Sequence, residues 1–269
     1  MDILFWKALL QGIVEGITEF LPVSSTGHMI LVDSFLKMEK PFSEMFEVVI
    51  QLGAILSVVV YFRKKIFDGL FSSFQSPAWQ LWKKVLAALV PALVLGGLFG
   101  SLIQEFLFNP LTGAVMLVLG GIALLIVEDP RVTSRQKCHF ENVEQLTYRR
   151  AVGIGLAQCL AMIPGTSRSA ATIIGGMGFG CNRALAAEFS FFLAIPTMAA
   201  ASAYSLLRHA TVMDRTQWIA LGIGFVTAFF VAWAVIAFFM AFIRKHDFRV
   251  FGYYRILLGG VILIWMCLK

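Results

Sequence analysis

Long apolar runs separated by short polar breaks dominate the sequence. Runs of this kind occupy residues 46–62, 85–107, 111–127, 186–206, 217–243 and 251–268. A helix needs about 20 apolar residues to cross a bilayer, and these runs lie close to or beyond that length. The pattern therefore predicts six transmembrane helices. The mixed segment at 66–82 is expected to form an interfacial loop or an amphipathic helix.

Two further apolar segments are interrupted by a proline. Residues 3–21 end at Pro22 and a short mixed segment follows at 25–36, whereas residues 149–164 end at Pro164 and a glycine-rich segment follows to about residue 181. Proline stops a helix, and Ser24 and Ser25 are good N-cap residues for a new one. We therefore expect two re-entrant helical hairpins, which are tolerated where their broken backbone is buried in protein.

The two halves of the chain resemble each other. The loop that begins at Pro22 matches the loop that begins at Pro164 with an offset of 142 residues, and Glu47 matches Glu188 with an offset of 141. Each half holds one hairpin and three spans, so the second half must enter from the opposite face. The sequence predicts an all-α polytopic membrane protein with an inverted repeat, whose hairpin tips meet near the bilayer midplane. Chance similarity between two short loops is the alternative.

A single integral membrane domain over residues 1–269 follows from this pattern. We place repeat 1 at about 1–127, a polar cytoplasmic connecting loop at about 128–147 and repeat 2 at about 148–269. Composition agrees, because 59% of the residues are hydrophobic and 14% are charged, whereas soluble proteins carry about 25% charged residues. The N-terminus shows no cleavage pattern of a removable signal peptide. The four cysteines show no metal-ligand spacing, and most are expected to be small core residues.

Basic residues set the expected orientation. The net charge is +6, but the lysines and arginines cluster between the spans, which indicates membrane topology rather than nucleic-acid binding. Of the 22 basic residues, 14 fall on the side that holds residues 63–84 and 6 on the other side. The positive-inside rule makes the richer side cytoplasmic, so both termini and the mouth of the first hairpin should face outward.

Ionisable side chains gather at the first hairpin. Gln11, Glu15 and Glu19 are four residues apart and form one polar stripe on a helix. His28 lies one turn after Ser25 on the same face. Ionisable groups within a bilayer are costly and are functional candidates by default. The alternatives are a surface helix with solvated carboxylates, a serine that only caps a helix and a histidine with a structural hydrogen bond.

The second hairpin contributes Ser167, Arg168 and Ser169. An arginine beside the N–H groups of helix N-termini is suited to bind phosphate. Glu15 and Glu19 would repel a phosphate unless a hard divalent cation, Mg²⁺ or Ca²⁺, lay between them. A hydroxyl and an imidazole complete the groups needed for metal-assisted phosphoryl transfer.

Three polar residues on the flanking spans need separate interpretation. Glu47, Gln51 and Glu188 either support the re-entrant backbone through hydrogen bonds or contact metal or substrate. We favour support of the backbone, because carbonyl and N–H groups at membrane depth need partners.

Three segments resemble the signatures of the BacA-type undecaprenyl-diphosphate phosphatases. They are Gly12 to His28 (GIVEGITEFLPVSSTGH), Phe46 to Gly53 (FEVVIQLG) and Pro164 to Ser169 (PGTSRS). The resemblance covers essentially the whole chain and implies a multi-pass enzyme of the bacterial inner membrane. That family converts undecaprenyl diphosphate to undecaprenyl phosphate and inorganic phosphate, recycles the carrier for peptidoglycan and other wall polymers, and is linked to bacitracin resistance.

The resemblance also implies roles for individual residues. It places the catalytic group at Glu19, Ser25, His28 and Arg168 and a metal pair at Glu15 and Glu19. Substrate phosphate binding is assigned to Ser24, Thr26, Gly27, Ser167 and Ser169. Whether Ser25 or His28 attacks phosphorus stays open. We favour Ser25 as the nucleophile, with His28 or Glu19 handling the proton. Ala170 stands where the family pattern has glycine, which removes no catalytic group.

Inverted repeats with broken helices are also typical of secondary transporters. The alternative function is therefore a transporter or flippase of a phosphorylated lipid on the same scaffold. A transporter needs no paired nucleophile and proton acceptor, so the Glu, Ser and His set favours catalysis. A lipid substrate with a long prenyl chain needs an apolar groove, which the 25 phenylalanines could line. The sequence leaves open whether the chain forms a homodimer.

Overall fold

The computed structural model describes residues 3–39, 42–68, 70, 74–133, 140–209 and 213–268, and these residues form helices and connecting turns. The elements are α1 (Ile3–Thr18), α2 (Ser25–Leu36), α3 (Phe42–Tyr61), α4 (Arg63–Phe67), α5 (Pro77–Leu107), α6 (Pro110–Val127), α7 (Pro130–Thr133), the 3₁₀ turn η1 (Val143–Gln145), α8 (Tyr148–Gln158), the 3₁₀ turn η2 (Cys159–Met162), α9 (Arg168–Gly178), α10 (Arg183–His209), α11 (Arg215–Ile243) and α12 (Arg249–Cys267). Within the described ranges no strand is present, apart from an isolated bridge between Phe140 and Cys181.

Six of the described helices, α3, α5, α6, α10, α11 and α12, are long and apolar enough to cross a membrane. The prediction of an all-α polytopic membrane protein is confirmed. The main difference is α5, which begins at Pro77 rather than near residue 85. Proline at the first turn of a helix is favourable, and Ser76 caps that turn by accepting a hydrogen bond from the N–H of Trp79 at 3.4 Å. The predicted interfacial segment therefore shrinks to α4 and the turn that follows it.

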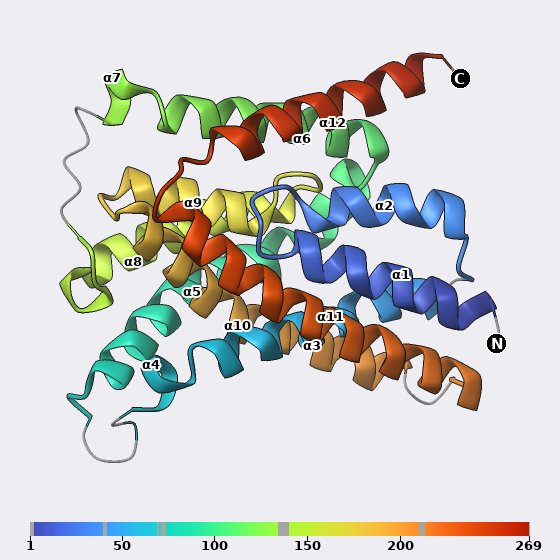
Figure 1. Cartoon of the computed structure of the whole chain (residues 1–269), viewed down its shortest axis with the longest axis horizontal. Coiled ribbons are helices and arrows are strands. Elements are labelled where there is room, and N and C mark those ends of the chain that lie inside the picture. Colours follow the sequence, from blue (N-terminus) through green and yellow to red (C-terminus); the bar gives the residue numbers. More distant parts are fainter. Residues whose placement is uncertain are drawn as a thin grey trace.

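The two predicted hairpins are present as α1–α2 and α8–η2–α9. Figure 1 shows α1 and α2 in the right half of the molecule, where both chain ends also lie, and α8 and α9 in the left half. The loops between the helices of each hairpin face each other in the middle of the molecule. The hairpins thus enter from opposite ends, as an inverted repeat requires. The repeat itself, and the assignment of residues 1–269 to one domain, stay predictions.

Phenylalanine side chains fill much of the core. Phe20 at the first hairpin packs edge-on against Phe191 of α10, with ring centroids 5.1 Å apart. Phe191 in turn contacts Phe239 of α11 at 6.0 Å, and all three rings are fully buried. These rings stabilise contacts between α10, α11 and the hairpin rather than line a lipid groove.

Glycines bring α6 and α12 close together. A Cβ atom on Gly121 would lie 2.7 Å from the carbonyl oxygen of Gly252 on α12. Such a distance is too short for any side chain, so both helices need glycine at this contact.

The end of the molecule opposite the termini carries an ion pair whose carboxylate is buried. Glu128, 2% exposed, accepts a hydrogen bond at 2.8 Å from Nε of Arg183 at the start of α10. It also accepts one at 3.1 Å from the N–H of Phe248, just before α12. Three helix ends are thereby joined.

The cysteine prediction is confirmed only in part. Cys181 is buried, Cys159 is partly buried and Cys267 is exposed. Cys138 and the rest of residues 134–139 in the connecting loop lie outside the described residues.

Candidate active site

Both hairpin tips place a serine in a left-handed backbone conformation immediately before a helix. Ser24 precedes α2 with φ 72° and accepts a hydrogen bond from the N–H of Gly27 at 3.3 Å. Ser167 precedes α9 with φ 70° and accepts one from the N–H of Ala170 at 3.2 Å. This conformation costs a non-glycine residue roughly 1–2 kcal/mol. Residues held in this way cluster at functional sites, because the surrounding structure fixes them.

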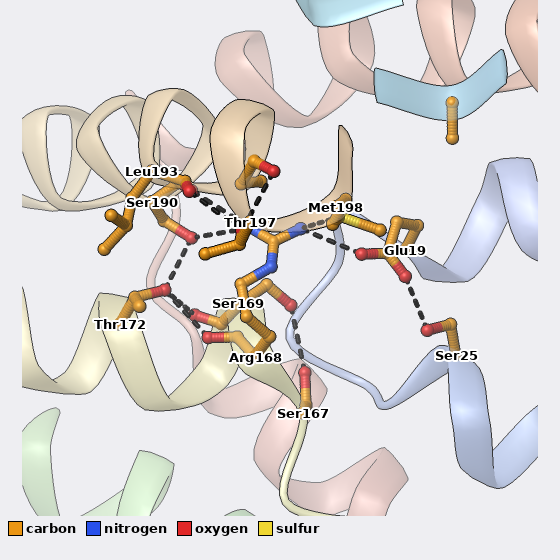
Figure 2. A network of polar contacts seen from close by, with 12 residues as sticks. Glu19, Ser25, Ser167, Arg168, Ser169, Thr172, Ser190, Leu193, Thr197 and Met198 are labelled. Carbon is orange, nitrogen blue, oxygen red and sulfur yellow. Dashed lines mark hydrogen bonds and ion pairs between the residues drawn. The ribbon is translucent and has the colours of Figure 1, made fainter. Parts of the chain in front are cut away.

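The first residues of these two helices meet through Glu19. The Ser25 hydroxyl donates a hydrogen bond to Glu19 Oε2 at 2.6 Å, and Arg168 Nη2 lies 2.8 Å from Glu19 Oε1. Figure 2 shows the three side chains in line, with the carboxylate between the hydroxyl and the guanidinium. The ion pair is largely shielded, because the Glu19 side chain is 6% exposed and that of Arg168 is 14% exposed. A hydroxyl held against a carboxylate that is itself oriented by a third group is the arrangement of an activated nucleophile.

Helix α10 fixes Arg168 from the other side. Arg168 Nη1 donates to the carbonyl oxygen of Ser190 at 3.0 Å. The Thr172 hydroxyl lies 2.6 Å from Ser190 Oγ and 2.8 Å from the carbonyl oxygen of Arg168, so α9 and α10 share one polar network (Figure 2). Sequence reasoning missed Thr172 and Ser190. Hydroxyl residues within apolar helices were the available signal, but helices often accommodate these without any functional role.

Ser169 joins the two hairpins directly. Its hydroxyl donates to the carbonyl oxygen of Leu21 at 2.8 Å and lies 3.0 Å from Ser167 Oγ. The side chain is buried and does not line the pocket described below. The structure thus uses this predicted phosphate ligand to hold one loop against the other.

A pocket opens between the hairpin tips, α5 and α10. The predicted site residues in its lining are Glu19, Ser24, Ser25, Thr26, Gln51, Ser167 and Arg168. Apolar lining comes from both hairpin and span residues, including Ala92, Phe108, Met162 and Met198. The pocket is therefore polar at the helix N-termini and apolar elsewhere, as a lipid with a charged head group would require.

Gln158, at the end of α8, also lines this pocket and was missed by sequence reasoning. Its buried Oε1 atom has no hydrogen-bond partner among the described residues, and neither does Nε of Arg168. Buried polar groups are almost always paired. Unpaired groups in a pocket wall therefore indicate a site that is completed by water or by a ligand.

His28 bonds to Ser24 and to helix α12 rather than to Glu19. Its Nδ1 atom is 2.8 Å from the carbonyl oxygen of Ser24, and its Nε2 atom is 2.6 Å from the hydroxyl of Tyr254 on α12. The imidazole also stacks on the Tyr254 ring, with centroids 5.6 Å apart. Both ring nitrogens are thus engaged away from the Ser25 hydroxyl, and His28 does not line the pocket.

Two more predicted residues lie apart from the pocket. Glu188 pairs with Lys65, whose Nζ atom is 2.8 Å from each carboxylate oxygen. Gly27 donates to the cap but does not line the pocket. Glu188 corresponds to Glu47 in the predicted repeat. In the structure, however, Glu188 forms an ion pair with Lys65 from the first half.

Glu15 lies behind Glu19. It is 1% exposed, does not line the pocket and has an Oε1 atom without a hydrogen-bond partner among the described residues. Its electrostatic neighbours are Glu19, Glu47 and Arg168. No group of three His, Cys, Asp or Glu side chains suited to a metal ion occurs in the described part of the chain. Any cation here would need further ligands from substrate or water.

Comparison with known proteins gives one consistent result. The family model of the bacitracin resistance protein BacA matches residues 8–261. The chain is 49% identical to "Undecaprenyl-diphosphatase 1" of Clostridioides difficile, with 98% of this chain and 96% of that protein aligned. It is 44% identical to "Undecaprenyl-diphosphatase" of Caldanaerobacter subterraneus over 98% and 96% of the two chains. The "Undecaprenyl-diphosphatase" of Enterococcus faecalis is 46% identical over 96% and 95%.

Proposed function

Because this chain belongs to the family of the bacitracin resistance protein BacA, we propose that it hydrolyses undecaprenyl diphosphate to undecaprenyl phosphate and inorganic phosphate. It is a membrane phosphatase that recycles the lipid carrier for cell-wall synthesis. The contact between Ser25 Oγ and Glu19 Oε2 at 2.6 Å carries this proposal, because it pairs a nucleophile with a proton acceptor inside the pocket.

In the reaction, the Ser25 oxygen bonds to the terminal phosphorus of the diphosphate while its proton passes to Glu19. The bond between that phosphorus and the bridging oxygen breaks, and its electron pair leaves with undecaprenyl phosphate. Glu19 passes that proton to the departing undecaprenyl phosphate and returns to its ionised form. A water molecule then attacks the phosphoserine and gives a proton to Glu19. The bond between phosphorus and the serine oxygen breaks, the serine oxygen takes the proton from Glu19, and inorganic phosphate leaves. We assign the proton to Glu19 rather than His28, because the His28 ring bonds to Ser24 and Tyr254.

Arg168 and the helix N-termini stabilise the phosphate. Both α2 and α9 begin in the pocket lining, and the N-terminus of a helix attracts anions. Arg168 neutralises charge that develops on the phosphoryl oxygens, and its unpaired Nε is a free donor. Ser24, Thr26, Ser167 and Gln158 supply further polar contacts from the wall.

We also propose that Glu15 and Glu19 would hold a divalent cation, Mg²⁺ or Ca²⁺. Carboxylate oxygens are the ligands these ions prefer, and the unpaired buried Glu15 Oε1 fits such a role. The ion, when bound, would offset the negative charge of the diphosphate beside two carboxylates.

The prenyl chain has a continuous apolar path from the pocket. Met162 lines both the polar pocket and a neighbouring groove formed by α5 and η2. Leu95 lines that groove and a second one between α5 and α8. We propose that the lipid tail lies along α5 with its head group at Ser25. The groove would have to open to the bilayer for a substrate delivered from the membrane.

We propose that the pocket opens to the outer, periplasmic side of the bacterial inner membrane. Phe108, at the C-terminal end of α5, lines it, whereas the basic residues Lys83 and Lys84 lie near the N-terminal end of the same helix. Accessibility of a cysteine at Phe108 to an impermeant maleimide added to intact cells would test this. A homodimer stays open and is decided by light scattering in detergent.

The test is release of inorganic phosphate from undecaprenyl diphosphate by the purified protein in detergent. We expect release that depends on a divalent cation, is lost with EDTA and is lost in Glu19→Gln, Ser25→Ala and Arg168→Ala. If the folded wild type releases no phosphate over a range of metals but moves a labelled prenyl diphosphate across vesicles, the transporter alternative replaces this proposal.

A further inference from the structure

Arg255 is a fully buried arginine within span α12, with an exposed fraction of 0%. Its guanidinium makes no ion pair with a carboxylate in the described part of the chain. It donates instead to five backbone carbonyl oxygens, those of Pro22 at 3.2 Å, Met116 at 3.1 Å, Leu117 at 3.3 Å, Gly165 at 2.9 Å and Thr166 at 3.0 Å. A buried charge is costly, so its retention calls for a role.

Three of these acceptors belong to the broken backbone of the hairpins. Pro22 lies in the loop of the first hairpin, whereas Gly165 and Thr166 lie in the loop of the second. Carbonyl groups released from a helix at membrane depth have no water to bond to. One guanidinium therefore serves both loops and joins them to each other.

Helix α6 is shaped to admit this side chain. A Cβ atom on Gly120 would lie 2.2 Å from Nη2 of Arg255 and 2.9 Å from its Cζ atom. Any side chain at position 120 would therefore displace the guanidinium. The carbonyl groups of Met116 and Leu117 one turn earlier hold it in the space that the glycine leaves.

The bonded carbonyls stand next to the residues that form the site. Thr166 directly precedes Ser167, and Pro22 lies two residues before Ser24; both serines have a positive φ. Tyr254, the neighbour of Arg255 on α12, bonds to His28, which in turn contacts the carbonyl oxygen of Ser24. Helix α12 therefore contacts the first loop twice, directly through Arg255 and indirectly through Tyr254 and His28.

We propose that Arg255 is a positioning residue for the phosphoryl transfer, a proposal that rests on the function proposed above. It holds the two hairpin loops at a fixed separation, and so keeps Ser25 and Glu19 of the first hairpin aligned with Arg168 of the second. Arg255 does not line the pocket and need not touch the substrate.

The activity test uses two substitutions that reach the guanidinium from different helices. Arg255→Lys keeps the positive charge but replaces the planar group that spans both loops. Gly120→Ala keeps Arg255 and displaces it. Gly260→Ala on α12 is the matched control, because its Cβ atom would meet nothing within 4 Å. Since a 1 Å misplacement costs about 100-fold, we expect kcat to fall about 10- to 100-fold in the first two variants while KM changes less than about threefold. The control should match the wild type.

Chemical rescue separates positioning from general stability. In Arg255→Gly, added guanidinium should restore part of kcat, whereas ammonium at the same concentration should not. Wild-type kcat in folded Arg255→Lys would overturn the proposal. A raised KM with unchanged kcat would also overturn it, because that pattern indicates substrate binding.

A distance measurement decides the proposal without any turnover. Nitroxides at exposed Ile30 on α2 and Leu160 in η2, in a background without native cysteines, report the separation of the hairpins by pulsed electron resonance. We expect a broader or shifted distance distribution in Arg255→Lys and an unchanged one in Gly260→Ala. An unchanged distribution in Arg255→Lys refutes the positioning role. Absence of phosphate release by the wild type refutes only the proposed function.

Discussion

The hydrogen bond between Ser25 and Glu19 implies that the two residues act as one unit in catalysis. We can therefore predict how far kcat falls when either residue, or both, is replaced. Ser25→Ala removes the oxygen that attacks phosphorus, and Glu19→Gln removes the proton acceptor 2.6 Å away. A positioned general base contributes about 10²–10⁴-fold to rate, which corresponds to about 2.7–5.4 kcal/mol of transition-state stabilisation. We therefore expect each single substitution to lower kcat by about 10²–10⁴-fold.

The double variant should be no slower than the slower single variant. Without the hydroxyl, Glu19 has no serine proton to accept, so its further loss should cost little. The coupling energy from the double-mutant cycle should thus approach the smaller of the two single effects. Independent roles would instead multiply the losses to about 10⁴–10⁸-fold.

The assay is steady-state phosphate release at saturating lipid, corrected for the folded fraction. That correction matters because Glu19→Gln leaves Arg168 without its 2.8 Å partner, and breaking a buried ion pair costs about 3–5 kcal/mol. Thermal unfolding in detergent measures this effect separately. Multiplicative losses, or a phosphoenzyme formed on His28 instead of Ser25, would refute the assignment.

Three further outcomes follow from the structure. Gly165 has φ +83°, and a Cβ atom there would lie 2.1 Å from the carbonyl oxygen of Gly113. Gly165→Ala should therefore lower kcat at least 100-fold. Gly113→Ala is the control in the phosphate assay, because its Cβ atom would have no neighbour within 4 Å. Glu128→Gln should lower stability by about 1.5–3 kcal/mol, because Arg183 loses the charge of its partner but stays 39% exposed to solvent; thermal unfolding checks this, and folded enzyme should keep its kcat. Removal of divalent metal with EDTA should abolish phosphate release, and Mg²⁺ or Ca²⁺ should restore it.

Spans and hairpin breaks were predictable because their causes are local. Run length sets whether a helix can cross the bilayer, and Pro22 and Pro164 indicate two breaks, although α1 already ends at Thr18 and α8 at Gln158. The start of α5 was misplaced for an equally local reason. Pro77 lay in a segment expected to be an interfacial loop or an amphipathic helix, although proline is also favourable in the first turn of a long helix.

Side-chain partners could not be predicted in the same way, because they come from distant parts of the chain. Arg255 bonds to residues 90 and 233 positions away, at Gly165 and Pro22. An arginine in an apolar span was a signal, but the sequence does not show what it contacts. The spacing of His28 correctly puts it near Ser25 along the helix. Only the position of Tyr254 on α12 decides where its ring points.

The broken helices of the two hairpins leave backbone N–H donors and carbonyl acceptors without helical partners. The structure directs these two kinds of group to different places. Helices α2 and α9 begin in the pocket wall, where their N-terminal N–H groups would attract the proposed diphosphate. The carbonyl groups of Pro22, Gly165 and Thr166 bond to Arg255, outside the pocket. If those carbonyls turned toward the substrate they would repel it. Each helix break exposes N–H donors toward the pocket and also frees carbonyl groups on the opposite side of the loop. The buried guanidinium of Arg255 pairs with those carbonyl groups.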